Sequence, residues 1–387
     1  MPRIELTSMK AVVYGQPANE ALADEVSRLD VRRILILASG TLNRETDEVE
    51  KLQTALGPRC AGVFDRVGAH VPRQDVIAAT HSAREADVDL IVTIGGGSPT
   101  DAAKAVSLCL ANGIDRPRDI DRLLTKVDTD GHPLPPDFKA PIIPQISIPT
   151  TLSAGEYSAI TGVTNEATGQ KDILKHPGMM PHMAILDPDV ARHTPEWLFL
   201  STGIRAIDHC VEGICSQTAN PFGDAQALRG LELLAKGLAA VKNQPDDRSA
   251  RLDCLLGAWL SMGPLVSGVP MGASHGIGYV LGARFGIPHG HTSCLMLPAV
   301  MEWNASVNSD RQRLVSAALG EAETDASVLL DALISGLGLP RGLLANGITI
   351  DDFDDIAGAA MLTPWVPKNP RQINGPEDVL EILALAQ

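Results

Sequence analysis

Short runs of apolar, mostly β-branched residues alternate with helix-like segments through the first half of the chain. Five of these runs have the length and composition of buried strands: 34–38, 60–64, 89–95, 143–149 and 183–188. Segments between them, such as 73–86 and 99–112, have the periodicity and length of helices. Strand, helix and strand in this rhythm predict a parallel sheet with helices on both faces.

After about residue 192 the pattern changes to leucine and alanine at three- and four-residue spacing, as in 224–241 and 323–339. Strand candidates largely disappear, so we expect an all-helical second domain. A chain of 387 residues is also too long for one compact core. We therefore predict two domains, an α/β domain at 1–191 and an all-α domain at 192–387. The polar, proline-rich stretch 115–140 is interpreted as a surface excursion.

One apolar stretch is long enough to cross a bilayer. Between Cys254 and Ala283 the chain has no Asp, Glu, Lys or Arg. The stretch nevertheless contains Pro264, Pro270 and several glycines, and it runs directly into a histidine-rich segment. We interpret it as two buried helices broken at the prolines, and we predict no association with a membrane.

The overall charge limits the partners. Lysine and arginine total 32 and aspartate and glutamate total 47, which gives a net charge of −15. Nucleic-acid phosphates would be repelled over most of such a surface, whereas a small anionic substrate stays possible because a few local cations can hold it. The six cysteines are scattered without CxxC pairs, and the start, MPRIELTSMK, has no apolar core of signal-peptide type. Both features favour reduced thiols and a cytoplasmic location.

The most informative local motif is DLIVTIGGGSPTDAAKAV at 89–106. An apolar strand ends in three glycines, after which Ser98 is predicted to cap a helix and Pro99 to occupy its first position. Glycines let a ligand approach the backbone, and a helix N-terminus favours a phosphate. We predict phosphate or pyrophosphate binding here, with a plain strand-to-helix turn as the alternative. The motif is not the GxGxxG fingerprint.

The motif GGGSPTDAAKA instead resembles the cofactor loop of the iron-containing, group III alcohol dehydrogenase superfamily. The resemblance continues through IPTTLSAGEYSAITGVTN (148–165), STGIRAIDHCVEG (201–213) and GIPHGHTSCLMLPAVMEWN (286–304), and so covers nearly the whole chain. It implies a Rossmann-like α/β domain followed by an all-α domain, the architecture shared with dehydroquinate synthase. It also implies NAD(H) or NADP(H) as cofactor, a small-molecule substrate and a homodimer.

The resemblance assigns cofactor-binding roles to residues of the first domain. The glycine loop would hold the pyrophosphate, two threonines would lie along the cofactor, and Lys171 would approach its ribose and nicotinamide end. Many relatives place an aspartate at the end of the first strand to bind the ribose hydroxyls, whereas this chain has Ser39. Because a serine would not repel a 2′-phosphate, we expect NADH use with some tolerance of NADPH. The full cofactor set is Ser39, Gly95, Gly96, Gly97, Ser98, Asp101, Thr150, Thr151 and Lys171.

Metal-dependent members of the superfamily hold Fe or Zn with one aspartate and three histidines. The matching positions here are Arg205, His209, His275 and His289, so the anionic ligand has become a cation. A like charge at about 4 Å costs on the order of 4 kcal/mol per unit charge at an effective dielectric of 20, and arginine cannot deprotonate to avoid this cost. We therefore predict a metal-free site. In the alternative, Arg205 points away and the three histidines bind Zn.

A second departure affects the proton donor. Where relatives have the second histidine of an HxxxH pair, this chain has Tyr279, one helical turn after His275. We predict that Arg205 polarises the reacting oxygen or binds a substrate carboxylate, while His209, His275, His289 and Tyr279 orient the substrate and donate a proton. A tyrosine that only fills the core is an equal alternative. His291, two residues after His289, is interpreted as a rim residue.

The compact stretch TTLSAGEYSAI resembles TTYAGSEMTPI-type segments of maleylacetate reductases. Those relatives, however, typically have a neutral amide where this chain has Arg205, and their histidine pair is usually intact. We predict metal-independent, NAD(P)H-dependent reduction of an oxo-acid such as maleylacetate, or of a related carbonyl or enone compound. A metal-dependent alcohol dehydrogenase, a cofactor-binding pseudoenzyme and a lyase of the dehydroquinate synthase type are the alternatives.

Overall fold

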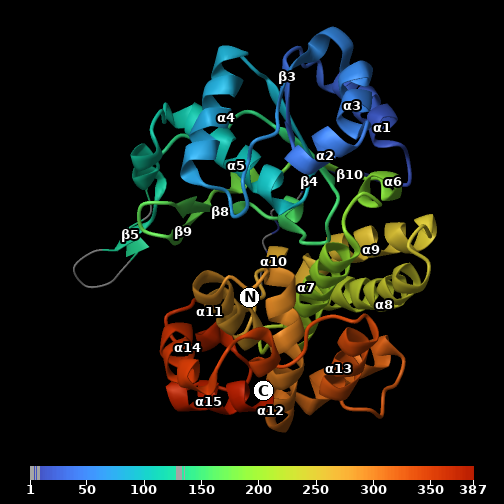
Figure 1. Ribbon diagram of the computed structural model, residues 1–387, viewed down its shortest axis with the longest axis vertical. Coiled ribbons are helices and arrows are strands. Elements are labelled where there is room, and N and C mark those ends of the chain that lie inside the picture. Colours follow the sequence, from blue (N-terminus) through green and yellow to red (C-terminus); the bar gives the residue numbers. More distant parts are fainter. Residues whose placement is uncertain (1–3, 5, 7–8, 128–132, 135) are drawn as a thin grey trace. The chain divides into compact units, whose positions relative to one another are not determined.

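A computed structural model describes residues 4, 6, 9–127, 133–134 and 136–387 (Figure 1). The chain forms two compact units. The α/β unit comprises residues 7–151 and 155–193, and the helical unit comprises residues 194–387 with the short segment Leu152–Ala154 and the N-terminal residues 1–6. The domain boundary after residue 191 stays a prediction.

The α/β unit is built on a six-stranded sheet in which every pair of neighbouring strands is parallel. The strand order is β1-β10-β7-β4-β2-β3. All five strands expected from the apolar runs are present, so the predicted α/β class is confirmed. The strands are β1 (Ala11–Tyr14), β2 (Ile34–Ala38), β3 (Cys60–Phe64), β4 (Leu90–Gly95), β7 (Gln145–Pro149) and β10 (Met183–Leu186).

Helices cover both faces of this sheet because side chains along each strand alternate in direction. Ile34 and Ile36 of β2 belong to a core cluster with residues of α1 and α3, whereas Leu35 and Leu37 pack in a second cluster with residues of α4 and α5. The helices of the unit are α1 (Ala18–Leu29), α2 (Gly40–Glu45), α3 (Glu48–Leu56), α4 (Arg73–Glu85), α5 (Gly97–Asn112) and α6 (Pro188–Ala191).

Two antiparallel hairpins lie outside the main sheet, and neither was expected from the sequence. One pairs β8 (Ile160–Asn165) with β9 (Gln170–Lys175), and the other pairs β5 (Lys126–Val127) with β6 (Pro133–Leu134). The second hairpin belongs to the predicted excursion at 115–140, of which residues 128–132 and 135 lie outside the described part of the chain.

The described part of the helical unit contains no strand. Its helices are α7 (Glu196–Cys215), α8 (Pro221–Asn243), α9 (Arg248–Ser261), α10 (Gly263–Val266), α11 (Ala273–Phe285), α12 (His289–Leu319), α13 (Ala326–Gly336), α14 (Phe353–Ala360) and α15 (Pro376–Leu385). The predicted all-α second half is thus confirmed.

The charge-free stretch from Cys254 to Ala283 falls on α9, α10 and α11. The chain breaks before Pro264 and again around Pro270, as the missing proline N–H groups require. Within this stretch, the short α10 between the two breaks is the element that the sequence did not indicate. Among the described residues, none of the helices combines the length and the uninterrupted apolar sequence that a membrane crossing would need.

Candidate functional site

The glycine turn between β4 and α5 has a backbone that requires glycine. Gly95 has a φ of +140°, and a Cβ placed there would lie 2.8 Å from the Cβ of Ser39 and 3.1 Å from the ring of Pro99. Helix α5 begins at Gly97 and has Gly96 as its N-cap residue, with no side-chain cap. The prediction that Ser98 caps the helix is wrong, because the chain becomes helical two residues earlier.

Three predicted cofactor residues surround this turn at the carboxyl edge of the sheet. Ser39 follows β2 and donates its backbone N–H to the carbonyl of Ile94 at 2.9 Å. Thr150 follows β7 and donates its backbone N–H to the carbonyl of Gly95 at 2.9 Å. Thr151 lies so close to Gly96 that a Cβ there would be 3.2 Å from the threonine methyl group. The open backbone at this edge is where parallel sheets bind ligands, and it fits a dinucleotide pyrophosphate.

The remaining predicted cofactor residues lie further along the α/β unit. Asp101 is on α5, where its carboxylate lies 3.3 Å from the ammonium of Lys104. Lys104 is fully buried and also donates to the carbonyls of Gly155 and Ile160, a role that its place in the motif did not reveal. Lys171 lies on β9 and packs across Gly162 of β8, so it belongs to the hairpin and not to the sheet edge.

The helical unit brings most of the predicted catalytic residues into one buried cluster. Arg205 and His209 lie one turn apart on α7, and His275 comes from α11. The rings of His209 and His275 have centroids 4.9 Å apart. Burial and the nearby charges of His275 and Arg205 hold the pKa of His209 well below its usual range, so this imidazole is neutral.

Arg205 points into this cluster and not into solvent. Its Nη1 donates to the hydroxyl of Ser293 at 3.1 Å and lies 3.8 Å from Oδ2 of Asp208. Its Cζ lies 5.9 Å from the centre of the Tyr279 ring, which is partly exposed. The cation that replaces the usual anionic ligand is therefore held among the predicted site residues.

Asp208 is a fully buried carboxylate that the sequence analysis missed. Its Oδ2 accepts hydrogen bonds from the hydroxyls of Ser274 and Ser293 at 2.8 and 2.7 Å. Burial alone would raise the pKa of Asp208, but the charge and hydrogen bond of His275, the charge of Arg205 and the hydrogen bond from Ser293 lower it to about 2. The residue is therefore an anion at neutral pH.

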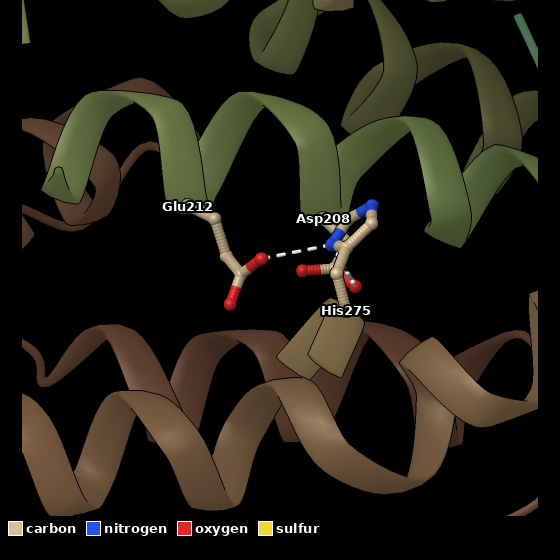
Figure 2. Close-up of side chains that lie close together, drawn as sticks. All are labelled: Asp208, Glu212 and His275. Carbon is tan, nitrogen blue, oxygen red and sulfur yellow. Dashed lines mark hydrogen bonds and ion pairs between the residues drawn. The ribbon is translucent and has the colours of Figure 1, made fainter. Parts of the chain in front are cut away.

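Glu212, also missed, binds Nδ1 of His275, the same nitrogen that lies 3.4 Å from Oδ2 of Asp208 (Figure 2). Its Oε2 accepts from Nδ1 of His275 at 2.8 Å and from the backbone N–H of Gly272 at 2.9 Å, and its Oε1 accepts from the backbone N–H of Ser274 at 2.8 Å. An ionised carboxylate can only accept, so Nδ1 of His275 carries a proton. The opposite nitrogen, Nε2, is buried and has no hydrogen-bond partner among the described residues.

A spacing signal for these two carboxylates was present in RAIDHCVEG. Asp208 follows Arg205 by three residues and Glu212 follows Asp208 by four, which places all three on one side of α7. The resemblance to metal-binding relatives points only to the positions of their ligands, so it does not indicate the acids beside them.

The other predicted site residues lie on α11 and α12. His289 is the first residue of α12, and its ring lies 3.5 Å from the position that a Cβ on Gly282 would take. Tyr279 is one turn after His275 on α11. His291 is half-buried and its ring lies 5.6 Å from that of Trp197, which agrees with its interpretation as a rim residue.

Two features of this cluster act against the binding of a divalent cation. Donor atoms of Asp208, Glu212 and His275 do lie within 4.8 Å of one another, but their contacting oxygens and Nδ1 already share hydrogen bonds. The guanidinium of Arg205 lies 3.8 Å from Asp208, and its charge acts to lower the pKa of His209 and of His275, although the carboxylates outweigh it at His275. The charge of Arg205 therefore acts on the same imidazoles that a metal would need. Each unit of like charge at about 4 Å costs on the order of 4 kcal/mol there.

Comparison with known proteins identifies the family of the chain. Residues 10–188 match the iron-containing alcohol dehydrogenases, and residues 199–387 match the C-terminal part of the same family. Dehydrogenase FUM7 of Gibberella moniliformis is 34% identical, with 97% of this chain and 95% of that protein covered. Maleylacetate reductase 1 of Rhodococcus opacus is 30% identical, with 96% and 93% covered.

A solved structure agrees with these sequence relatives. The crystal structure of maleylacetate reductase from Rhizobium sp. strain MTP-10005 has a TM-score of 0.82 and 28% identity, with 100% of this chain and 98% of that chain covered. The predicted architecture, a Rossmann-like parallel sheet followed by helices, is the one that these relatives share. The chain belongs to the iron-containing alcohol dehydrogenase family and is an oxidoreductase.

Proposed function

We propose that this oxidoreductase uses NAD(P)H to reduce an oxo-acid such as maleylacetate, or a related carbonyl or enone compound, without a bound metal. The observation that carries the proposal is the position of Arg205. Its guanidinium is held by Ser293 and Asp208 beside His209 and His275, where metal-dependent relatives need a carboxylate. The similarity to maleylacetate reductases supports the substrate class.

The glycine turn of the α/β unit would hold the cofactor, with the pyrophosphate against Gly95, Gly96, Gly97 and Ser98. The positive φ of Gly95 and the absence of side chains at Gly95, Gly96 and Gly97 leave backbone N–H groups for an anion. Asp101, Thr150, Thr151 and Lys171 complete the proposed set. Because Ser39 carries no charge, NADH is the expected cofactor and NADPH is tolerated.

When bound, NAD(P)H supplies the hydride that reaches the substrate carbon, and the bonding electron pair then moves onto the substrate oxygen. Arg205 would stabilise the charge that develops there, as a fixed donor in a site with little water does. Its planar fork could equally bind a substrate carboxylate, so both contacts belong to the proposal.

His275 is the proposed proton donor to that oxygen. Glu212 holds one proton on Nδ1, so the second proton of the imidazolium would be on Nε2, the buried nitrogen without a partner among the described residues. The Nε2 proton would pass to the substrate oxygen and leave His275 neutral with its proton on Nδ1. The neutral His209, together with His289 and Tyr279, would orient the substrate. A cytoplasmic location and assembly as a homodimer stay predictions.

The test is an NADH-oxidation screen of maleylacetate, small oxo-acids and aldehydes, with and without EDTA, on protein purified without chelator and analysed for metal. We expect reduction of an oxo-acid that EDTA does not affect, and a metal content far below stoichiometric. The Arg205→Asp variant should lose this activity. Stoichiometric Fe or Zn that turnover requires would overturn the metal-free site, and cofactor binding without any oxidation would favour a pseudoenzyme.

A further inference from the structure

Asp208 has no role in the function proposed above, yet it is the most deeply buried charge beside Arg205. It lies three residues after Arg205 on α7, is fully buried, and makes its described contacts through one oxygen, Oδ2. A buried carboxylate is costly unless cations and donors surround it. Two positively charged or titratable groups face Oδ2: Nη1 of Arg205 at 3.8 Å and Nδ1 of His275 at 3.4 Å. Since His275 also has Glu212 as a partner, Asp208 is the one carboxylate among the described residues that Arg205 contacts.

Ser293 links the two charges. Nη1 of Arg205 donates to the serine oxygen at 3.1 Å, and the serine hydroxyl donates to Oδ2 of Asp208 at 2.7 Å. A hydroxyl has a single proton to give, so the direction runs from the guanidinium through the serine to the carboxylate. The serine is itself fully buried, on α12, so this link crosses between two helices.

The third side of the guanidinium is bounded by α11. The position of a Cβ on Gly278 would lie 3.9 Å from Nη1 of Arg205, and the ring of Tyr279 lies beside Cζ. Three helices thus enclose the side chain, and the ion pair with Asp208 is the charged contact among them. The other carboxylate, Glu212, is occupied by His275 and two backbone N–H groups.

We propose that Asp208 is the positioning residue for Arg205, acting through Ser293. Asp208 supplies an anion about one helical turn after position 205, where metal-dependent relatives have theirs. It holds the guanidinium in the orientation that reduction requires. This inference rests on the proposed role of Arg205. Neither Asp208 nor Ser293 reacts, so their removal should lower turnover without changing how the cofactor binds.

The test is chemical rescue by guanidinium. The Arg205→Ala variant should lose about 10²- to 10³-fold in kcat with NADH and the most rapidly reduced substrate of the screen. Guanidine hydrochloride at tens of millimolar, well below denaturing concentrations, should restore about tenfold. In the double variant Arg205→Ala, Asp208→Asn, the added cation has no carboxylate to hold it, and rescue should disappear.

A matched control uses another partly buried carboxylate of the same unit that also pairs with an arginine. Asp224 on α8 pairs with Arg311, outside the cluster, so Arg205→Ala, Asp224→Asn should still be rescued. Equal rescue with and without Asp208 would overturn the positioning role alone. Full activity of Arg205→Ala would instead contradict the proposed function of Arg205, so the two failures are distinguishable.

Single variants keep the inference testable if guanidinium fails to enter the site. Asp208→Asn preserves the shape of the side chain and should lower kcat by about 10²-fold, because a small displacement of the guanidinium is enough to reduce the rate by this factor. The Kd of NADH should stay unchanged. Ser293→Ala removes only the hydroxyl between Arg205 and Asp208. It should also lower kcat, and the protein should fold normally. An unchanged kcat in both variants would end the inference.

Discussion

At the scale of single residues, the cluster is organised by charge. Two carboxylates, Asp208 and Glu212, are buried with one permanent cation, Arg205, and one titratable group, His275. When His275 is protonated, two cations face two anions, and when it is neutral one anion is left over. Buried charges are tolerated when they are paired, so the cluster favours the protonated form.

This balance leads to a pH prediction for His275. Burial and Arg205 act to lower its pKa, but Asp208 and Glu212 outweigh them and raise it above 6.5. A proton donor with a raised pKa stays active to higher pH, so kcat should be constant below that pKa and fall as pH rises through it. In Glu212→Gln the fall should move to lower pH. A pH profile of kcat measures both, and an identical profile in the two proteins would contradict the donor role.

At the scale of elements, the turn from β4 into α5 needs glycine both for its backbone conformation and for the space that a side chain would fill. At Gly95 the φ of +140° and the 2.8 Å approach to Ser39 both exclude a side chain. Gly95→Ala should therefore destabilise the protein by about 2 kcal/mol and weaken NADH binding at least about tenfold, because the loop must shift. Urea unfolding and NADH fluorescence titration measure the two effects.

The other end of the same helix supplies the control. Gly113 caps α5 with a φ of +60°, and a Cβ there would meet nothing within 4 Å. Gly113→Ala should cost about 1 to 2 kcal/mol of stability through the backbone alone and leave the Kd of NADH unchanged. Weaker NADH binding in this variant, or unchanged binding in Gly95→Ala, would argue against the loop as the pyrophosphate site.

Elements whose apolar pattern matches their burial could be predicted from the sequence. The runs at 34–38 and 90–95 are buried along their whole length, so composition alone identified β2 and β4. The edge strand β1 has only four residues and is partly exposed, and the hairpin β8–β9 has a mixed pattern, so neither was recognised.

The acids of the site were missed for a different physical reason. Nearly every residue of α7 from Phe199 onward is buried, including its charged ones, so hydrophobic periodicity does not separate Asp208 and Glu212 from solvated acids. Their partners, such as Ser274 and Ser293, lie more than sixty residues away in the sequence. Only tertiary packing brings these groups together, whereas the aligned positions of Arg205 and the histidines follow from resemblance alone.

At the scale of the whole molecule, the net charge of −15 acts against the proposed substrate class. An oxo-diacid carries two negative charges and is repelled by the summed field of the protein, while a neutral aldehyde is not. Salt screens this field, since the Debye length falls from about 30 Å at 0.01 M to about 8 Å at 0.15 M. Local attraction by Arg205 is screened less because that side chain is buried among protein groups.

Ionic strength should therefore separate the two substrate classes. Between 0.01 and 0.15 M salt, kcat/KM for maleylacetate should rise by about two- to fivefold as long-range repulsion is screened, whereas kcat/KM for a neutral aldehyde should stay constant. The measurement uses saturating NADH, so that salt effects on cofactor binding do not enter, and compares chloride with acetate to exclude competition by the anion. If kcat/KM for maleylacetate falls as salt is added, positive charges along the route to the site outweigh the net negative charge of the protein. The substrate would then be attracted by cations outside the cluster around Arg205.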